Sequence, residues 1–302
     1  MKERVLIATL VIILVVSIVH VGSEKFVSHV PQKQKEEHIE VLKSMSEMEN
    51  RLAYEKELAL SDSTIQSDMN QKKSLPEYVN LYPDLYVDKI EPNIADKTEK
   101  IAYLTFDDGP SENTLKNLKT LEEKNAVATF FILGSTMDKA GEEALKKMVE
   151  QGCAIGIHTY SHEKNIIYGS VESFLGDFNQ VYHQVFEITG VKPQIFRFPW
   201  GSYNKYCRPI KSDLVSEMDR RGFTYYDWNV SAEDSVGHPT AESIMKNIMK
   251  DVKKYNQPVI LMHDAKTNKL TSELLPQIID KLIELGYTFD TLDHRQPCQF
   301  CY

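Results

Sequence analysis

The chain has 302 residues, 42% of them hydrophobic and 26% charged, so it is long enough to bury the core of one large globular domain. Its formal net charge of −9 argues against nucleic acid as a partner, because phosphate binding relies on clusters of lysine and arginine. No repeat of fixed period occurs, which argues against a solenoid or a propeller.

Residues 1–23 predict a membrane anchor. Lys2 and Arg4 precede an apolar run over residues 5–19, and the small-residue pattern typical of signal-peptide cleavage does not follow it. With the residues just after it, the run approaches the roughly 20 residues that a membrane-spanning helix needs. The basic residues ahead of the run leave everything beyond Ser23 outside the cytoplasm. We therefore expect a single-pass protein of the cell membrane with an extracytoplasmic domain, or a secreted protein if the segment is cleaved.

Residues 24–100 predict a stalk or linker. Residues 32–68 are rich in Glu, Lys, Gln, Met and Ser, with apolar residues at spacings of three or four, as on a polar helix with a thin apolar stripe. The stripe is irregular for a coiled coil, so a spacer is the main prediction and oligomerisation through the stalk is the alternative. Three prolines in residues 74–100 indicate an extended connector that packs partly on the next domain.

From residue 101 onward, strand and helix patterns alternate. The predicted strands are Ile101–Phe106, Ala128–Leu133, Cys153–Ile157, Gln194–Phe198, Phe223–Asp227, Pro258–Met262 and Tyr287–Thr291. The predicted helices are Asn113–Lys124, Ala140–Gln151, Val171–Thr189, Ser212–Arg221, Ala241–Tyr255 and Thr271–Leu285. Short apolar strands separated by such helices indicate parallel β/α units, and seven strands favour a barrel over residues 101–302. A doubly wound sheet is the weaker alternative, because residues 107–110 are acidic where a phosphate-binding loop would be rich in glycine.

Acids and histidines follow the first and third predicted strands, at the ends where barrel enzymes assemble their sites. Asp107 and Asp108 are adjacent, so alternation along the strand would let one ligate a metal while the other faces a substrate. His158 and His162 are four residues apart, which on a helical turn would place both imidazoles on one face. Two histidines and one carboxylate leave coordination positions open, as in a catalytic metal site. The alternatives without a functional role are acids in a solvated turn and histidines on the surface or in the core.

Three later segments add groups that could serve such a site. Arg197 lies near the end of the fourth strand, where it could keep a carboxylate ionised or simply form an ion pair at the barrel rim. The turn at residues 199–201 could aim the backbone N–H of Trp200 at an oxyanion. His263 emerges from a buried strand, and a hydrogen bond to Asp234 would make it a plausible proton donor to a leaving group.

Taken together, these segments resemble the polysaccharide deacetylase family, the NodB-homology group of metal-dependent carbohydrate esterases. The resemblance rests on five motifs in order, namely TFDDGP at 105–110, HxxxH at 158–162, RxPWG at 197–201, WxxxxxD at 228–234 and LxHD at 261–264. It spans about residues 101–291 and implies that this part is the catalytic domain, with a distorted (β/α)7 barrel fold.

The resemblance also implies a role for each residue of the motifs. Asp107 would be the general base, tethered by Arg197, and His263 would be the general acid, steadied by Asp234. The metal ligands would be Asp108, His158 and His162. The ion would be one divalent metal, zinc by default, with cobalt, nickel or iron as alternatives. The substrate and oxyanion wall would be formed by Pro199, Trp200, Tyr203, Trp228 and Leu261.

The substrate implied by the resemblance is a cell-wall or extracellular polysaccharide, with peptidoglycan first, from whose N-acetylglucosamine units acetate is released. The alternatives are an O-deacetylase of acetylated xylan and a non-catalytic, membrane-anchored protein that binds the wall. The fourth motif lacks one Asp and the final Trp of the peptidoglycan branch, and Trp200 replaces the commoner Tyr, so the sugar-binding wall near Ser235 departs from the pattern. Cys298 and Cys301 stand near the end of the chain, where an extracytoplasmic location permits a disulfide.

Overall fold

A computed structural model of the chain describes residues 76–89 and 98–296. Nearer the amino terminus it describes only residues 43, 46, 48, 49, 51–53 and 56, all of them helical and exposed. The chain divides into two compact units, Met1–Leu75 and Pro76–Tyr302, and the fold below is that of the second. The predicted anchor over residues 1–23 lies outside the described residues, as do Cys298 and Cys301. Within the residues that are described, no helix combines the length and apolarity needed to cross a membrane.

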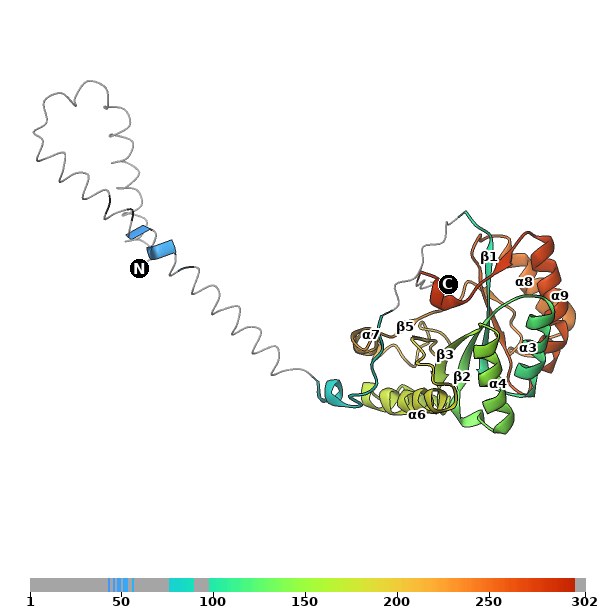
Figure 1. Cartoon of the computed structure of the whole chain (residues 1–302), viewed down its shortest axis with the longest axis horizontal. Coiled ribbons are helices and arrows are strands. Elements are labelled where there is room, and N and C mark those ends of the chain that lie inside the picture. The colour runs from blue at the N-terminus through green and yellow to red at the C-terminus, as the bar shows by residue number, and fades with distance from the viewer. Residues whose placement is uncertain are drawn as a thin grey trace, which may run out of the picture. The chain divides into compact units, whose positions relative to one another are not determined.

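One sheet forms the centre of this unit (Figure 1). Its strands are β1 (Ile101–Gly109), β2 (Thr129–Leu133), β3 (Ala154–Thr159), β4 (Ile195–Phe196), β5 (Thr224–Tyr225), β6 (Val230–Ser231), β7 (Val259–His263) and β8 (Thr288–Phe289). They follow the order β5-β4-β3-β2-β1-β7-β6, with β8 paired to β1, and every ladder is parallel. Because β5 and β6 stand at the two ends of this order, the sheet is a partly open barrel.

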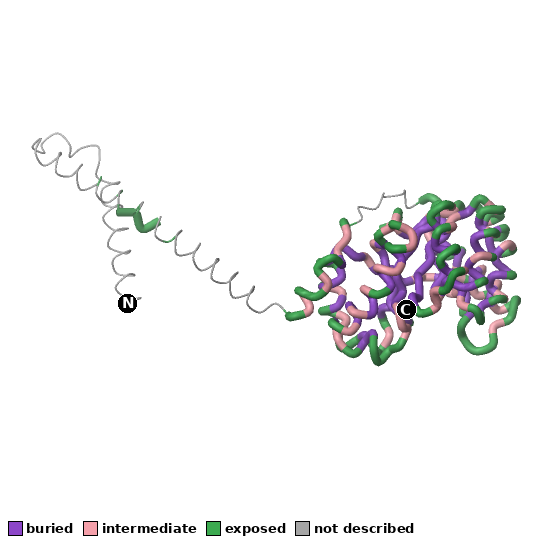
Figure 2. Tube along the Cα trace, turned by 60° about the horizontal axis from the view of Figure 1, so that its bottom comes forward, coloured by how far each residue is buried: buried purple, intermediate pink, exposed green. Residues whose placement is uncertain are grey.

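Helices connect the strands and lie around the sheet (Figure 1). The α-helices are α3 (Glu112–Glu123), α4 (Lys139–Glu150), α5 (Lys164–Ile167), α6 (Val171–Thr189), α7 (Lys211–Arg220), α8 (Ala241–Val252) and α9 (Lys269–Glu284). Short 3-10 turns are η2 (Glu77–Asn80), η3 (Gly134–Thr136) and η4 (Leu292–His294). Capping boxes at Ser111, Ser170 and Thr240 start α3, α6 and α8, because each side chain satisfies a backbone N–H of the first turn. Figure 2 shows that the strands are buried and that the helices expose their outer faces.

Alternation along β1 decides which residues reach the inside of the barrel. Ala102, Leu104 and Phe106 pack in the large core that includes residues of the surrounding helices. Ile101 and Tyr103 belong instead to a small inner cluster with residues of β2, β4 and β7. Since successive side chains of a strand point to opposite faces, the inner row continues through Thr105 to Asp107. The carboxyl end of the inner face is therefore polar while the rest is apolar.

The predicted parallel β/α arrangement is confirmed. Each of the seven predicted strands and six predicted helices corresponds to an observed element, and α6 has the predicted bounds. The structure adds a short strand, β6, and a short α-helix, α5, that the patterns did not predict, besides the three 3-10 turns. The strand β6 has two residues and the helix α5 has four, which is too short for hydrophobic periodicity to reveal either of them.

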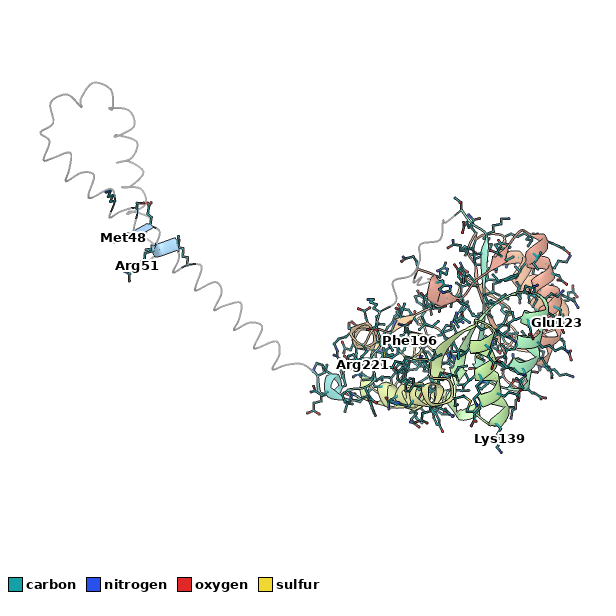
Figure 3. The ribbon with its side chains drawn as sticks, viewed as in Figure 1. Met48, Arg51, Glu123, Lys139, Phe196 and Arg221 are labelled. Carbon is teal, nitrogen blue, oxygen red and sulfur yellow. The ribbon has the colours of Figure 1, made fainter. Side chains whose placement is uncertain are left out.

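The compact unit begins upstream of residue 101, because residues 76–89 pack on α7 and the turn after it. Arg221, labelled in Figure 3, lies in that turn, is fully buried and donates hydrogen bonds to four backbone carbonyls of the segment. Val87 N–H donates to the Arg221 carbonyl at 2.9 Å. Gly222 follows with φ +90°, and a Cβ there would collide with the Val87 carbonyl. The segment is thus fastened to the folded domain by backbone contacts.

Candidate active site

Asp107 ends the inner row of β1 and is only 3% exposed. Its Oδ1 accepts a hydrogen bond from Arg197 Nη1 at 2.9 Å. Burial raises the pKa of Asp107, and the charges of Arg197 and His263 offset only part of that effect. A carboxylate that binds protons more readily than usual, and that is held by a fixed cation, is suited to act as a base.

Arg197 follows β4 directly and has no exposed surface. Besides Asp107, its guanidinium donates to Thr105 Oγ1 at 2.7 Å and to the backbone carbonyls of Tyr226 and Asp227 at 2.9 and 3.2 Å. It also lies over the Phe131 ring, 4.2 Å from the ring centre. With every edge of the guanidinium occupied, Arg197 has one orientation, and it imposes one on Asp107. The alternative of a solvated ion pair at the rim is therefore excluded.

Asp108 lies in the same pocket as Asp107, although simple alternation would send the two side chains to opposite sides. The reason is a break in strand geometry, because β1 shifts register between Asp107 and Gly109 and Asp108 has φ +70°. Gly109 permits the close approach of the next segment, since a Cβ there would collide with the buried carboxylate of Asp264. Both acids of the motif consequently face one site.

Asp108, His158 and His162 form a candidate metal centre. Asp108 Oδ1 lies 3.5 Å from His158 Nε2 and 3.6 Å from His162 Nε2, and all three ligand atoms fall within 4.8 Å of one another. Asp108 Oδ1 is buried and has no hydrogen-bond partner. An orphaned carboxylate oxygen facing two imidazole nitrogens fits a divalent cation that keeps open positions. It is the one such group of three among the described residues.

His158 is prepared as a ligand by its surroundings. Its Nδ1 lies 2.9 Å from the Arg197 carbonyl, which fixes the tautomer with a proton on Nδ1 and leaves the Nε2 lone pair facing Asp108. Burial lowers the pKa of His158 well below its usual value, and the nearby charges of His162 and Arg197 act in the same direction. The imidazole is therefore neutral at physiological pH, as metal ligation requires.

His162 reaches the cluster through a turn, so the expectation of a helical turn was wrong. His158 is still within β3, and His162 lies three residues beyond its end with φ +56°. The turn is held by Asp177 of α6, whose carboxylate accepts from the N–H groups of Tyr160 and Ser161 at 2.6 and 3.0 Å. Asp177 is a positioning residue that no local motif indicated, because its partners lie 16 and 17 residues away.

His263 has to be protonated to act as an acid, whereas the ligand His158 has to be neutral. Its Nδ1 lies 2.8 Å from Asp234 Oδ1, and its backbone N–H donates to Asp234 Oδ2 at 2.8 Å. Asp234 is buried and also accepts from Thr271 Oγ1 at 2.7 Å. Burial lowers the pKa of His263, but the hydrogen bond to Asp234 and the charges of Asp234, Asp107 and Asp108 outweigh it and raise the pKa to about 9. The imidazole is therefore protonated at neutral pH and can donate a proton.

These groups open into one pocket of about 340 Å³. Trp200, Trp228 and Leu261 line it as expected, while Tyr203 lines an adjoining hollow together with both tryptophans. Pro199 lines neither of these hollows, and its carbonyl is tied to the Tyr168 hydroxyl. The sequence placed the altered sugar-binding wall near Ser235, which lines the pocket, but it did not single out Ser231, Glu233 or Val236. They all lie between Trp228 and the start of α8, so the fourth motif was the part of the sequence that could have indicated them.

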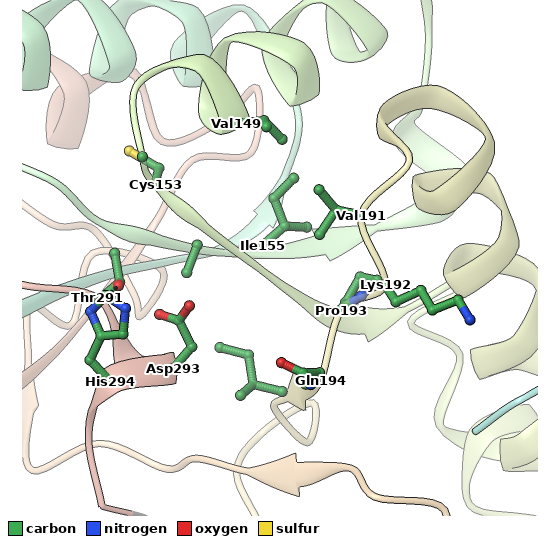
Figure 4. A pocket seen from close by; sticks show the side chains of 13 residues that line it. Val149, Cys153, Ile155, Val191, Lys192, Pro193, Gln194, Thr291, Asp293 and His294 are labelled. Carbon is green, nitrogen blue, oxygen red and sulfur yellow. Dashed lines mark hydrogen bonds between the residues drawn. The ribbon is translucent and has the colours of Figure 1, made fainter. Parts of the chain in front are cut away.

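Another pocket, of about 370 Å³, lies at the opposite ends of the strands. It is lined by Cys153, Ala154 and Ile155 at the start of β3, and by residues around η4 (Figure 4). Figure 4 shows apolar side chains such as Val149 and Val191 on one side, with Asp293 and His294 on the other. In parallel α/β barrels the carboxyl ends of the strands carry the chemistry, so this pocket is not part of the candidate site.

A buried base, a charged imidazole and an Asp-His-His cluster at the carboxyl edge of a parallel α/β sheet define, as a class, a hydrolytic enzyme. A model of the family described as polysaccharide deacetylase matches residues 95–218. YheN of Bacillus subtilis, whose name assigns it provisionally to the polysaccharide deacetylases, is 30% identical over 236 residues, which are 76% of this chain and 80% of that protein. The chain therefore belongs to the polysaccharide deacetylase family.

Two further similar proteins are named peptidoglycan N-acetylglucosamine deacetylases. A peptidoglycan-N-acetylglucosamine deacetylase of Bacillus cereus is 28% identical over 226 residues, covering 73% of this chain and 80% of that protein. The crystal structure of the catalytic domain of peptidoglycan N-acetylglucosamine deacetylase from Eubacterium rectale is 33% identical, with a TM-score of 0.63. That comparison covers 73% of this chain and 98% of the crystallised one.

Proposed function

We propose that this protein is a metal-dependent deacetylase that hydrolyses the acetamide of N-acetylglucosamine units in a cell-wall polysaccharide, with peptidoglycan as the first candidate. The observation that carries the proposal is the presence of a base, an acid and a candidate metal cluster in a single pocket. The names of the Bacillus cereus and Eubacterium rectale relatives support peptidoglycan as the polymer.

The protein's own residues divide the acid–base work. Asp107 accepts a proton from the attacking water, and Arg197 holds its carboxylate toward the site. The Trp200 backbone N–H, in a turn where Trp200 has φ +60°, is the proposed donor to the oxyanion. His263 gives its proton to the departing amine nitrogen, and Asp234 stabilises the imidazolium before that step. The products are acetate and a glucosamine unit.

The proposed ligands of the cation are Asp108, His158 and His162. When bound there, a divalent ion supplies Lewis acidity toward the acetamide carbonyl and lowers the pKa of water, which neither imidazole nor carboxylate can do. Zinc is the default for this ligand set, which also suits cobalt, nickel and iron.

Two alternative functions are included in the experimental test. One relative, from Pseudobutyrivibrio xylanivorans, is named a bifunctional xylanase/deacetylase and is 29% identical over 199 residues, so an O-acetylated xylan belongs among the substrates tested. A non-catalytic wall-binding protein would be expected to lose a ligand or an acid–base group. Here Asp107, Asp108, His158, His162 and His263 are all present and converge on one pocket.

We also propose that residues 1–23 anchor the chain in the cell membrane and that residues 24–75 hold the catalytic unit away from the surface. The support is the apolar run behind Lys2 and Arg4. This location would bring the site to a polymer that lies outside the cytoplasm, and cleavage of the segment would release the same unit. Fractionation of cells that express the full chain tests the anchor.

Acetate release from N-acetylglucosamine oligomers, purified peptidoglycan and acetylated xylan tests the function. With the native protein we expect release that stops with a chelator and returns with zinc. Asp108→Asn is expected to lower metal content and reduce activity by at least about 100-fold, because the loss of a carboxylate ligand removes the orphaned charge that faces the histidines. Metal content measured by elemental analysis after dialysis is the second readout. Chelator-resistant release from the native protein would contradict the metal assignment.

The proton donor predicts an asymmetric pH profile. Activity should fall as the pH rises through the pKa of His263, near 9, because only the protonated imidazole can donate. In Asp234→Asn the hydrogen-bonded anion is gone while burial remains, so the descending limb of kcat/KM should move down by more than one pH unit. NMR titration of His263 checks the assignment directly. A descending limb that stays in place would show that another group donates the proton.

A further inference from the structure

Beside the pocket lies a surface whose side chains have no role in the acid–base mechanism proposed above. Trp200, Tyr203 and Tyr206 are 46%, 44% and 36% exposed, which is unusual for three neighbouring aromatic residues of one loop. Three lysines lie on their rings. We call the surface the basic aromatic strip, and it consists of Trp200, Tyr203, Tyr206, Lys164, Lys205 and Lys211.

The strip is continuous with the candidate active site. Trp200 lines the main pocket, and its ring lies 4.6 Å from the ring of His162. The same tryptophan lines the adjoining hollow of about 180 Å³ with Tyr203 and Trp228. On its other side it meets the Tyr206 ring edge-on at 5.8 Å. A polymer whose reacting unit sits in the pocket can therefore extend over this loop.

The lysines of the strip are held in place by aromatic faces. Lys164 and Lys205 lie 4.9 and 5.2 Å from the centre of the Tyr206 ring, and Lys211 lies 4.7 Å from that of Tyr203. Lys211 also donates to Ser202 Oγ at 3.3 Å. Within the part of the chain that the structure describes, none of the three forms an ion pair with a carboxylate. Three uncompensated cations stand together on a chain whose net charge is −9.

The loop under the strip is rigid. Asn204 donates to the carbonyls of Pro199 and Gly201 at 3.0 and 2.7 Å and accepts from the N–H groups of Tyr206 and Cys207 at 2.8 and 2.9 Å. Ser202 is fixed by the buried Asp227, and Cys207 is completely buried beneath the loop. The aromatic rings and their lysines are therefore preorganised, which lowers the entropic cost of binding a ligand.

Charge distinguishes the two rims of the pocket. On the rim formed by residues 231–236 the one acidic lining residue is Glu233, which is exposed like Ser235 and Val236 and whose Oε2 accepts from Asn247 at 3.2 Å. On the rim formed by Trp200, the basic aromatic strip presents the ammonium groups of its lysines. A neutral glycan would gain nothing from this polarity, whereas a glycan with anionic groups on one side of the reacting unit would be oriented by it.

We infer that the basic aromatic strip is a binding site for carboxylate-bearing sugar units adjacent to the N-acetylglucosamine unit being deacetylated. The inference rests on the proposed function for the identity of the reacting unit. The sugar rings lie against Trp200 and Tyr203, and the carboxylates pair with Lys164, Lys205 and Lys211. The strip selects strands in which neutral and acidic amino sugars alternate over uniformly neutral chitin-like oligomers.

Binding to two forms of one polymer tests the inference. The probes are solubilised strands of alternating N-acetylglucosamine and N-acetylmuramic acid, and the same strands with every carboxyl converted to a neutral methylamide. The test variant is Lys164→Gln/Lys205→Gln/Lys211→Gln in the full chain. The control variant, Lys139→Gln/Lys146→Gln/Lys250→Gln, removes the same charge from exposed positions on α4 and α8. Dissociation constants are measured at low salt, and acetate release is followed in parallel.

We expect the native chain and the control variant to bind the acidic strands about tenfold more tightly than the neutralised ones, and the test variant to bind both alike. Raising the salt concentration should reduce the difference between the affinities of the native chain for acidic and for neutralised strands. Equal affinity of the native chain for both probes would overturn the inference, and so would a preference that survives in the test variant. A preference for acidic strands without any acetate release would support the carboxylate-binding role of the strip and refute the proposed deacetylase function.

Discussion

Replacing Asp107 with asparagine is expected to lower kcat for acetate release by about 10²- to 10⁴-fold, the contribution typical of a positioned general base. Asparagine has nearly the same shape, and its carbonyl oxygen can still accept the hydrogen bond from Arg197. The pKa of the native carboxylate is raised, which makes it a better proton acceptor. The amide of asparagine is not basic and cannot accept a proton from water. Because the lost interaction belongs to the transition state, the effect should appear in kcat with little change in KM.

The neighbouring acid provides the matched control. Asp107→Asn is expected to keep the native metal content, since Asp107 is not among the three clustered ligand atoms, whereas Asp108→Asn is expected to lose it. Both variants should keep the native circular dichroism spectrum, because each exchange is nearly isosteric. If Asp107→Asn retained kcat within tenfold of the native value, the base would have to be another group. If it lost the metal, Asp107 would be a ligand.

Regular patterns allowed most of the fold to be predicted. The continuous helical pattern over residues 171–189 reproduced α6, because a capping serine precedes it and Gly190, with φ +72°, ends it. Apolar runs located β1, β2, β3 and β7 within a few residues. The order of the motifs along these strands was enough to bring Asp107, His158 and His263 to one edge of the sheet.

Local backbone geometry at the site could not be predicted in the same way. Four residues that line the pocket, Asp108, His162, Trp200 and Glu233, have positive φ although none is glycine. Such conformations cost free energy and persist only where the surroundings determine them, as Asp177 does for the turn before His162. Rules of strand alternation and helical spacing assume regular backbone. These rules therefore identified Asp108 and His162 as candidate site residues, but they did not show how the two side chains reach the same pocket.

Replacing Arg221 with methionine is expected to destabilise the catalytic unit by about 3–5 kcal/mol, the range found when one partner of a buried ion pair is removed. The Arg221 Nε donates to Glu217 Oε1 at 2.6 Å, and its two other nitrogens serve the carbonyls of Tyr78, Leu81, Tyr82 and Leu85. Methionine fills similar volume without a donor, so it would remove one of the two arginines that pair with the buried Glu217 and the donor that the four carbonyls share. Thermal unfolding should begin roughly 6–20 °C lower for a domain of this size.

Arg220→Met is the matched control, because Arg220 also pairs with Glu217 and donates to the Val79 carbonyl but its side chain is 39% exposed. Water can replace its hydrogen bonds, so we expect a loss of at most about 1 kcal/mol. Limited proteolysis separates the causes, since residues 76–89 should become cleavable in Arg221→Met well below its unfolding temperature and stay protected in Arg220→Met. Equal stability of the two variants would mean that the segment is held by Gly222 and the Val87 backbone contact alone, and that the buried guanidinium contributes little to fastening it.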